Sequence, residues 1–116
     1  MGSNLSVTIR LERTAIVMVL GGELDLASFP QLEHAIDRAL ESDPELMVLD
    51  LEALEFMDIA GLRSVIRSEQ RLRGLGKRLV VAAPGAGVRR LVALTHQQDA
   101  LHLAASTAEA LGPETR

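Results

Sequence analysis

The sequence predicts an α/β fold in which a mixed sheet of four to five strands is packed with about four helices. Residues 5–11 alternate between apolar and polar side chains, as in a strand with one covered face. Short apolar runs follow at residues 15–20, 46–51, 78–83 and 101–104, and the first three of these are expected to be strands covered on both faces. Segments with helical periodicity separate the runs, so the expected order is β-β-α-β-α-β-α-β-α.

The expected helices begin at four points of the chain: Ser28, Asp58, close to Val88, and Ser106. Ser28 with Gln31, and Ser106 with Glu109, have the spacing of a capping box, in which two side chains satisfy free N–H groups at a helix start. Because these signals stand just before helix-period segments, they predict where two of the helices begin.

The composition excludes several classes of function. The 116 residues (12.5 kDa) leave room for one domain, expected to span residues 1–116. The chain has no Cys, Trp or Tyr, which excludes disulfides, thiolate metal sites and cysteine nucleophiles and leaves little to stack on nucleobases. No apolar run approaches the roughly 20 residues that span a bilayer, and no leader segment is recognised. We expect a cytoplasmic protein with no direct contact to nucleic acid and no insertion into a membrane.

Acidic and basic residues are unevenly distributed along the chain. Residues 1–58 carry twelve acids and three arginines, a net charge of −9, whereas residues 59–116 carry nine bases and four acids, a net charge of +5. Arg63, Arg67 and Arg71 recur at i, i+4 and i+8, so they share one face of the second helix. Either this basic face meets an acidic partner, or the two halves of the chain neutralise each other after folding.

No arrangement of residues matches a catalytic or metal-binding template. Residues 85–87 are glycine-rich and precede a helix, but Arg90 stands where a dinucleotide-binding loop needs a third glycine. The three histidines are scattered, and no serine has histidine and aspartate at a triad-like spacing. We therefore expect no enzymatic activity, no cofactor and no metal.

Two carboxylates stand out by their positions. Asp25 follows the second expected strand, and Asp58 stands at the start of the second helix. Loops at one end of neighbouring strands converge in an α/β sheet, so the two side chains are expected to lie close together. Asp58 can accept hydrogen bonds from free N–H groups of the helix, which stabilises a helix by about 1 kcal/mol. A helix start also attracts anions, so a nucleotide-binding role stays open, although the carboxylate itself repels phosphate.

Three segments share a pattern with a known family. Residues 22–30 read GELDLASFP, similar to a G-x-L-D-x-x-[ST] segment, and residues 48–51 read VLDL, similar to a central strand that ends in D-L. Residues 56–62 read FMDIAGL, similar to F-x-D-S-x-G-[LIV] at the start of a helix. In their order and spacing, over essentially the whole chain, these segments resemble the STAS family, the domain of bacterial anti-sigma factor antagonists and anion transporters.

The resemblance implies a protein that binds an anti-sigma factor, usually a serine kinase, and so releases a sigma factor. In the family, the kinase phosphorylates the serine after the motif aspartate, and the phosphate breaks the complex. Here Ile59 occupies that position and Ala60 follows, so no hydroxyl can accept phosphate there. Regulation would then come from partner abundance, from another phosphosite such as Ser28, or from none.

The implied partner-binding surface combines the loop after the second strand with the start of the second helix. Asp25 would contact the partner or orient the loop, and Asp58 would hold the helix start. Ile59 and Leu62 would supply apolar contact. The expected partner-binding residues are Glu23, Asp25, Ser28, Asp58, Ile59, Ala60, Gly61, Leu62, Arg63 and Arg67. A weak homodimer is left open.

A second hypothesis keeps the fold and changes the role. Some stand-alone proteins of this family are cytoplasmic accessory subunits of membrane transporters. The arginine face would then meet an acidic surface of the transporter.

Overall fold

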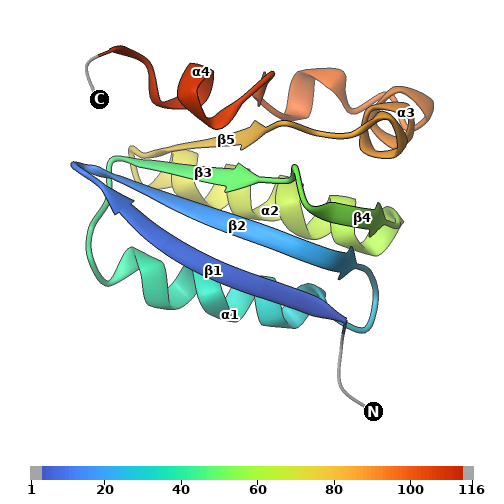
Figure 1. Ribbon diagram of the computed structural model, residues 1–116, viewed down its shortest axis with the longest axis horizontal. Helices are drawn as coiled ribbons and strands as arrows, with labels where there is room; N and C mark the ends of the chain where they lie inside the picture. The colour runs from blue at the N-terminus through green and yellow to red at the C-terminus, as the bar shows by residue number, and fades with distance from the viewer. Residues whose placement is uncertain (1–3, 114–116) are drawn as a thin grey trace.

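The computed structural model describes residues 4–113, which form a mixed six-stranded sheet with four α-helices packed on it (Figure 1). The strands are β1 (Leu5–Glu12), β2 (Ala15–Leu24), β3 (Leu46–Asp50), β4 (Leu54–Met57), β5 (Arg78–Ala82) and β6 (Leu103–Ala104). The helices are α1 (Phe29–Leu40), α2 (Ile59–Gly74), α3 (Ala86–Leu94) and α4 (Thr107–Leu111), with a 3-10 turn at Gln98–Ala100. The predicted fold class is confirmed, and β4 is a short strand that the sequence analysis did not predict.

The strand order places the carboxyl ends of several strands at one edge of the sheet. The order is β1-β2-β3-β5-β6, and β4 pairs with the last residues of β2. β1 and β2 form an antiparallel hairpin whose turn is Arg13 and Thr14, with Arg13 at a left-handed φ of 56°. The other described pairs are parallel. In α/β sheets, functional loops gather at the carboxyl ends of parallel strands.

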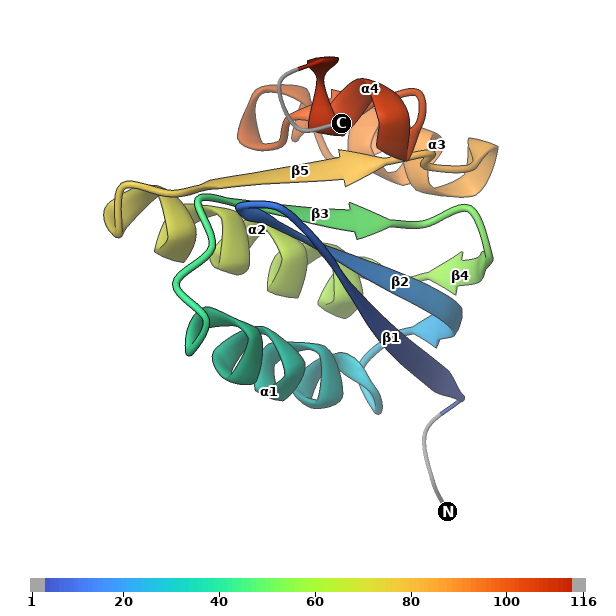
Figure 2. The same ribbon diagram turned by 60° about the vertical axis from the view of Figure 1, so that its left-hand side comes forward.

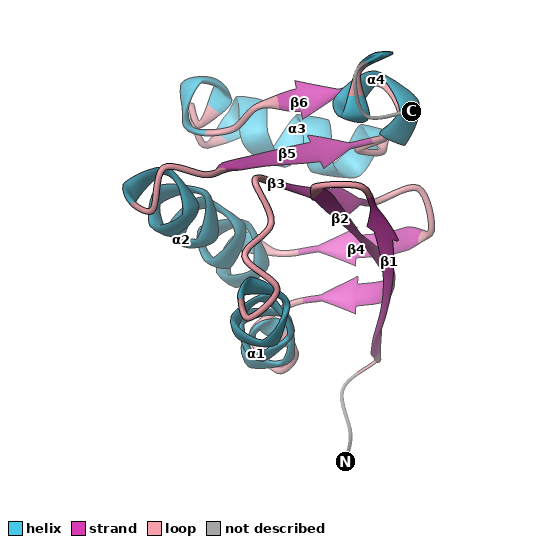
Figure 3. Ribbon diagram, turned by 90° about the vertical axis from the view of Figure 1, so that its left-hand side faces the viewer, coloured by secondary structure: helices cyan, strands magenta, loops and turns pink. Residues whose placement is uncertain are grey.

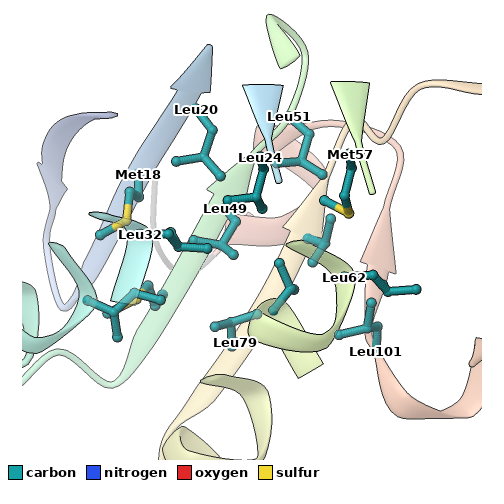
Figure 4. Close-up of a cluster of buried hydrophobic side chains, with 14 of the residues drawn as sticks. Met18, Leu20, Leu24, Leu32, Leu49, Leu51, Met57, Leu62, Leu79 and Leu101 are labelled. Carbon is teal, nitrogen blue, oxygen red and sulfur yellow. The ribbon is translucent and has the colours of Figure 1, made fainter. Parts of the chain in front are cut away.

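Helices cover the two faces of the sheet unequally. Figures 2 and 3 show α1 and α2 on one face and α4 on the other. The main core lies between the sheet and α1, α2 and α3, and its helical members include Leu32, Ile36, Leu62, Leu72, Val88 and Val92. On the other face, Leu111 of α4 packs in a smaller cluster with Val17 and Val48. Aliphatic side chains and methionine fill the main core (Figure 4), as expected for a chain with only two aromatic residues.

Opposite charges from the two halves of the chain pair between α1 and α2. Arg67 lies 2.8 Å from Glu33, and Arg71 pairs with Asp37. Partial burial raises the pKa of Glu33, but hydrogen bonds from Ser64 and Arg67 outweigh burial and hold that pKa below its ordinary value. The expected neutralisation between the halves is confirmed for these pairs, and two of the three arginines on this face are engaged within the molecule.

The capping box expected at Ser28 is wrong. The Ser28 hydroxyl makes no cap bond; it donates to the Glu23 carbonyl at 2.8 Å and accepts the Asp25 N–H at 2.9 Å. Gln31, the other expected half of the box, donates its side-chain amide to the Leu5 carbonyl at 2.9 Å. Ser28 therefore stabilises the loop that follows β2, and Gln31 joins α1 to β1, roles that the capping spacing does not reveal.

Candidate functional site

The loop after β2 and the start of α2 meet at one edge of the sheet. β2 and β4 are parallel neighbours with Leu24 opposite Met57, so the segments that leave them emerge side by side. Asp58 N–H donates to the Leu24 carbonyl at 3.2 Å, and Asp58 Oδ2 accepts the Leu26 N–H at 3.2 Å. The expected proximity of the Asp25 loop and Asp58 is therefore confirmed.

Asp58 holds the first turn of α2 in a fixed position. Its Oδ1 accepts the Gly61 N–H at 2.8 Å, while its Oδ2 accepts the Leu26 N–H from the facing loop. Its backbone carbonyl accepts the Leu62 N–H at 2.9 Å, the first hydrogen bond of the helix. A carboxylate in this place is further stabilised by the positive end of the helix dipole. The predicted capping role of Asp58 is confirmed, and one side chain joins the helix to the loop.

Asp25 and Ser28 organise the loop between β2 and α1. Asp25 Oδ1 accepts the N–H groups of Ala27 and Ser28, both at 3.0 Å, and the Ser28 hydroxyl lies 3.1 Å from the same oxygen. Ser28 is 1% exposed, whereas Asp25 is half-buried. The Ser28 hydroxyl is therefore not exposed in this conformation, which disfavours the predicted roles of Ser28 as a contact residue and as an alternative phosphosite.

Gly61 and Leu62 pack α2 against the sheet. A Cβ on Gly61 would lie 2.3 Å from the Leu24 carbonyl oxygen, so only glycine allows the helix to approach the end of β2 this closely. Leu62 is 2% exposed and belongs to the main core with Met57 and Leu101 (Figure 4). Both residues are buried, which favours a role in positioning the helix over the predicted direct contact with a partner.

Three large apolar side chains are exposed on the two segments that meet. Ile59, on the first turn of α2, is 44% exposed, and Ala60 beside it is half-buried. Leu26 in the loop is 71% exposed, and Phe56 at the end of β4 is 51% exposed. Sequence reasoning missed Leu26 and Phe56. Leu26 directly follows Asp25, and Phe56 lies two residues before Asp58, so proximity to the two motif aspartates was the available signal.

The charged residues of the expected site differ in how they are engaged. Arg67 is bonded to Glu33 and lies 5.4 Å from the centre of the Phe29 ring, which favours a cation–π contact. Arg63 is exposed, and no ion pair is found for it within residues 4–113. Glu23 is half-buried at the end of β2. Arg63 is therefore the arginine of this face whose charge is open to a partner.

The arrangement is suited to recognition of another macromolecule. Within residues 4–113, no three His, Asp or Glu side chains gather closely enough to hold a metal ion. None of the helices in that range combines the length and the apolar character that a bilayer crossing requires. The start of α2 is thus fixed by hydrogen bonds and carries the exposed apolar side chain of Ile59.

Comparisons with known proteins agree with the fold. The model of the STAS domain family matches residues 6–110. Anti-sigma-F factor antagonist RsfB of Mycobacterium tuberculosis is 29% identical over 108 residues, which cover 93% of this chain and 88% of that protein. The anti-sigma-B factor antagonist of Staphylococcus aureus is 24% identical over 100 residues, covering 86% and 93% of the two chains. A crystal structure of an anti-sigma factor antagonist from Mycobacterium paratuberculosis superposes with a TM-score of 0.84, at 26% identity and 96% coverage of both chains.

Replacing Gly61 with Ala tests the close approach of α2 to β2. We expect the free energy of unfolding to fall by about 1–3 kcal/mol, because the Leu24 carbonyl must move to admit the new Cβ. Gly74→Ala, in the same helix, is the matched control: a Cβ there meets nothing within 4 Å, so the change should be neutral or stabilise by up to about 1 kcal/mol. Urea denaturation measures both, and equal losses would contradict the packing described.

Proposed function

Since the chain belongs to the STAS domain family, we propose that it acts as an anti-sigma factor antagonist, which binds an anti-sigma factor and so releases a sigma factor. The names of the two relatives and of the crystal structure support this role, and their alignments extend over most of the chain. In this role the protein has no catalytic activity of its own.

The partner we propose is an anti-sigma factor of the serine kinase type. The observation that carries the proposal is the exposed Ile59 on a helix start that Asp58 holds in place. A preorganised apolar side chain loses little conformational entropy on binding, so it contributes more affinity than a mobile one. Leu26, on the loop that Asp58 joins to the helix, adds a second exposed apolar side chain.

The residues of the proposed interface divide into two groups. The contact residues are Glu23, Asp25, Leu26, Phe56, Ile59, Ala60, Arg63 and Arg67, all partly or fully exposed. The positioning residues are Ser28, Asp58, Gly61 and Leu62, which fix the loop and the helix start. Arg63 favours an acidic group on the partner, since its charge is not balanced by an ion pair within residues 4–113.

In the proposed function, phosphorylation of this surface does not regulate binding. Residues 59–62 contain no hydroxyl, so the position that corresponds to the family phosphoserine cannot carry phosphate. Ser28, the other candidate, is buried and hydrogen-bonded. The protein would then bind its partner whenever both are present, and the amount of each would set the outcome.

The transporter hypothesis loses the observation that motivated it. It required an arginine face open to an acidic surface, but Arg67 and Arg71 are paired with Glu33 and Asp37 of α1. The single remaining arginine, Arg63, lies beside Ile59 at the proposed antagonist surface. We therefore retain the antagonist proposal.

Placing a charge on the exposed apolar side chain tests the interface. Ile59→Asp is expected to weaken binding of the anti-sigma factor at least about tenfold, because a carboxylate would be desolvated in an apolar contact. Leu75→Asp is the matched control, since Leu75 is 56% exposed and lies at the end of α2 away from Ile59. Isothermal titration calorimetry measures both affinities. Equal affinities for Ile59→Asp and Leu75→Asp would contradict the interface.

Restoring a hydroxyl tests the absence of the phosphorylation switch. After incubation with the kinase and ATP, intact-mass and peptide mass spectrometry should find no phosphate on the wild-type chain. Ile59→Ser should gain one phosphate at residue 59 and then bind the anti-sigma factor more weakly, because the phosphate adds charge to an apolar contact. Phosphate on Ser28 of the wild-type protein would overturn the proposed regulation.

A further inference from the structure

One edge of the sheet is open along β1. Within residues 4–113, β1 pairs with β2 alone and lies at the end of the strand order, as Figure 3 shows. Two of its apolar residues are unusually exposed, Ile9 at 45% and Leu11 at 70%. An open edge that carries exposed apolar side chains is a template for pairing with another strand.

The ladder between β1 and β2 determines which backbone groups face outward. In an antiparallel pair, alternate residues direct their N–H and C=O groups to the partner strand, and the residues between them direct theirs away. Glu12 and Ala15 flank the two-residue turn and therefore form a hydrogen-bonded pair, and Glu23 N–H donates to the Asn4 carbonyl at 3.1 Å. Even-numbered residues of β1 thus face β2, and odd-numbered residues face the open edge.

At one end of this edge, an outward backbone group is already hydrogen-bonded to the Gln31 side chain. The Leu5 carbonyl accepts a hydrogen bond from the side chain of Gln31, as an outward-facing group can. For the outward backbone groups of Val7, Ile9 and Leu11, no hydrogen bond is found within residues 4–113, and this stretch is long enough for a short ladder.

We propose that β1 pairs with β1 of a second copy of this chain, antiparallel about a two-fold axis that places Ile9 opposite Ile9 of the second copy. Val7 of each copy then lies opposite Leu11 of the other. These three hydrogen-bonded pairs supply about six N–H···O bonds. The apolar side chains of both strands fall on the same face of the joined sheet, because the period of a strand is two residues.

Neighbouring registers are less favourable for identifiable reasons. With Thr8 at the axis, the outer pairs would require the Leu5 carbonyl, which Gln31 occupies. With Arg10 at the axis, two arginines would lie directly opposite each other, and like charges in that position destabilise a sheet. With Ile9 at the axis, Arg10 faces Thr8 of the second copy, and each Arg10 keeps its ion pair with Glu12 at 2.9 Å.

The proposed dimer leaves both anti-sigma-factor surfaces uncovered. The Leu5 end of β1 is the end near Gly22 and the loop that follows β2. Because the two-fold axis passes through Ile9, the Leu5 ends of the two copies point in opposite directions. One dimer would therefore carry two separated copies of the candidate functional site.

The mass of the protein in solution tests the proposal, independently of any anti-sigma factor. In sedimentation equilibrium, the wild-type mass should rise with concentration from 12.5 kDa toward twice that value. Ile9→Pro removes an outward N–H without removing a bond to β2, so it should stay monomeric and folded. Thr8→Pro is the matched control for the ladder: it removes a bond to β2 and should lower the thermal midpoint more than Ile9→Pro does. A wild-type mass of 12.5 kDa at all concentrations, or a dimer that survives Ile9→Pro, would overturn the proposal.

Single cysteines test the register, since the chain has none of its own. Cα atoms of a hydrogen-bonded pair lie about 5.5 Å apart, within the range a disulfide bridges, so Ile9→Cys should cross-link under mild oxidation. Two Arg10 positions would lie roughly 8 Å apart, so Arg10→Cys should stay monomeric on a non-reducing gel. Cross-linking of Arg10→Cys with none for Ile9→Cys would overturn the assigned pairing.

Discussion

The candidate site depends on the hydrogen bonds that the carboxylate of Asp58 accepts. Its two oxygens accept N–H groups from different segments, Gly61 in the first turn of α2 and Leu26 in the loop after β2. The absence of a side chain at Gly61 lets α2 begin against the end of β2. These contacts fix the direction in which Ile59 is exposed. A short, local set of hydrogen bonds thus gives the edge of a mixed sheet a defined surface, the one proposed to bind the partner.

The chemistry of this surface suits constant binding more than switching. In the proposed function, a phosphate would have to appear at the helix start to release the partner, yet residues 59–62 offer no hydroxyl. The nearby Ser28 hydroxyl is buried and supports the loop. Two of the four arginines on α2 pair with acids of α1, and Arg73 pairs with Glu69 of α2 itself. In the proposed function, Arg63 beside Ile59 is then the contact that can select an acidic partner.

Much of the fold and part of the site could be predicted from sequence, and the differences have physical causes. The strands other than β4, the cap at Asp58 and the cap at Ser106 depend on local patterns, so they were predicted correctly. β4 has only four residues and pairs with β2 across a register shift, which local periodicity does not show. Ser28 has capping spacing, but its hydroxyl bonds to the backbone of Glu23 and Asp25 ahead of the helix. The burial of Leu62 depends on how closely Gly61 lets α2 approach. The exposure of Leu26 and Phe56 also depends on how β2 and β4 pair at the edge of the sheet, which the sequence alone does not show.

Amide hydrogen exchange, followed by mass spectrometry with and without the anti-sigma factor, tests the central claim most directly. In the free protein, the amides of Leu26 and Gly61 should exchange slowly, because both donate to Asp58. Adding the anti-sigma factor should increase protection in residues 24–28 and 59–63. Rapid exchange of those two amides in the free protein, or new protection confined to α3 and α4, would contradict the account.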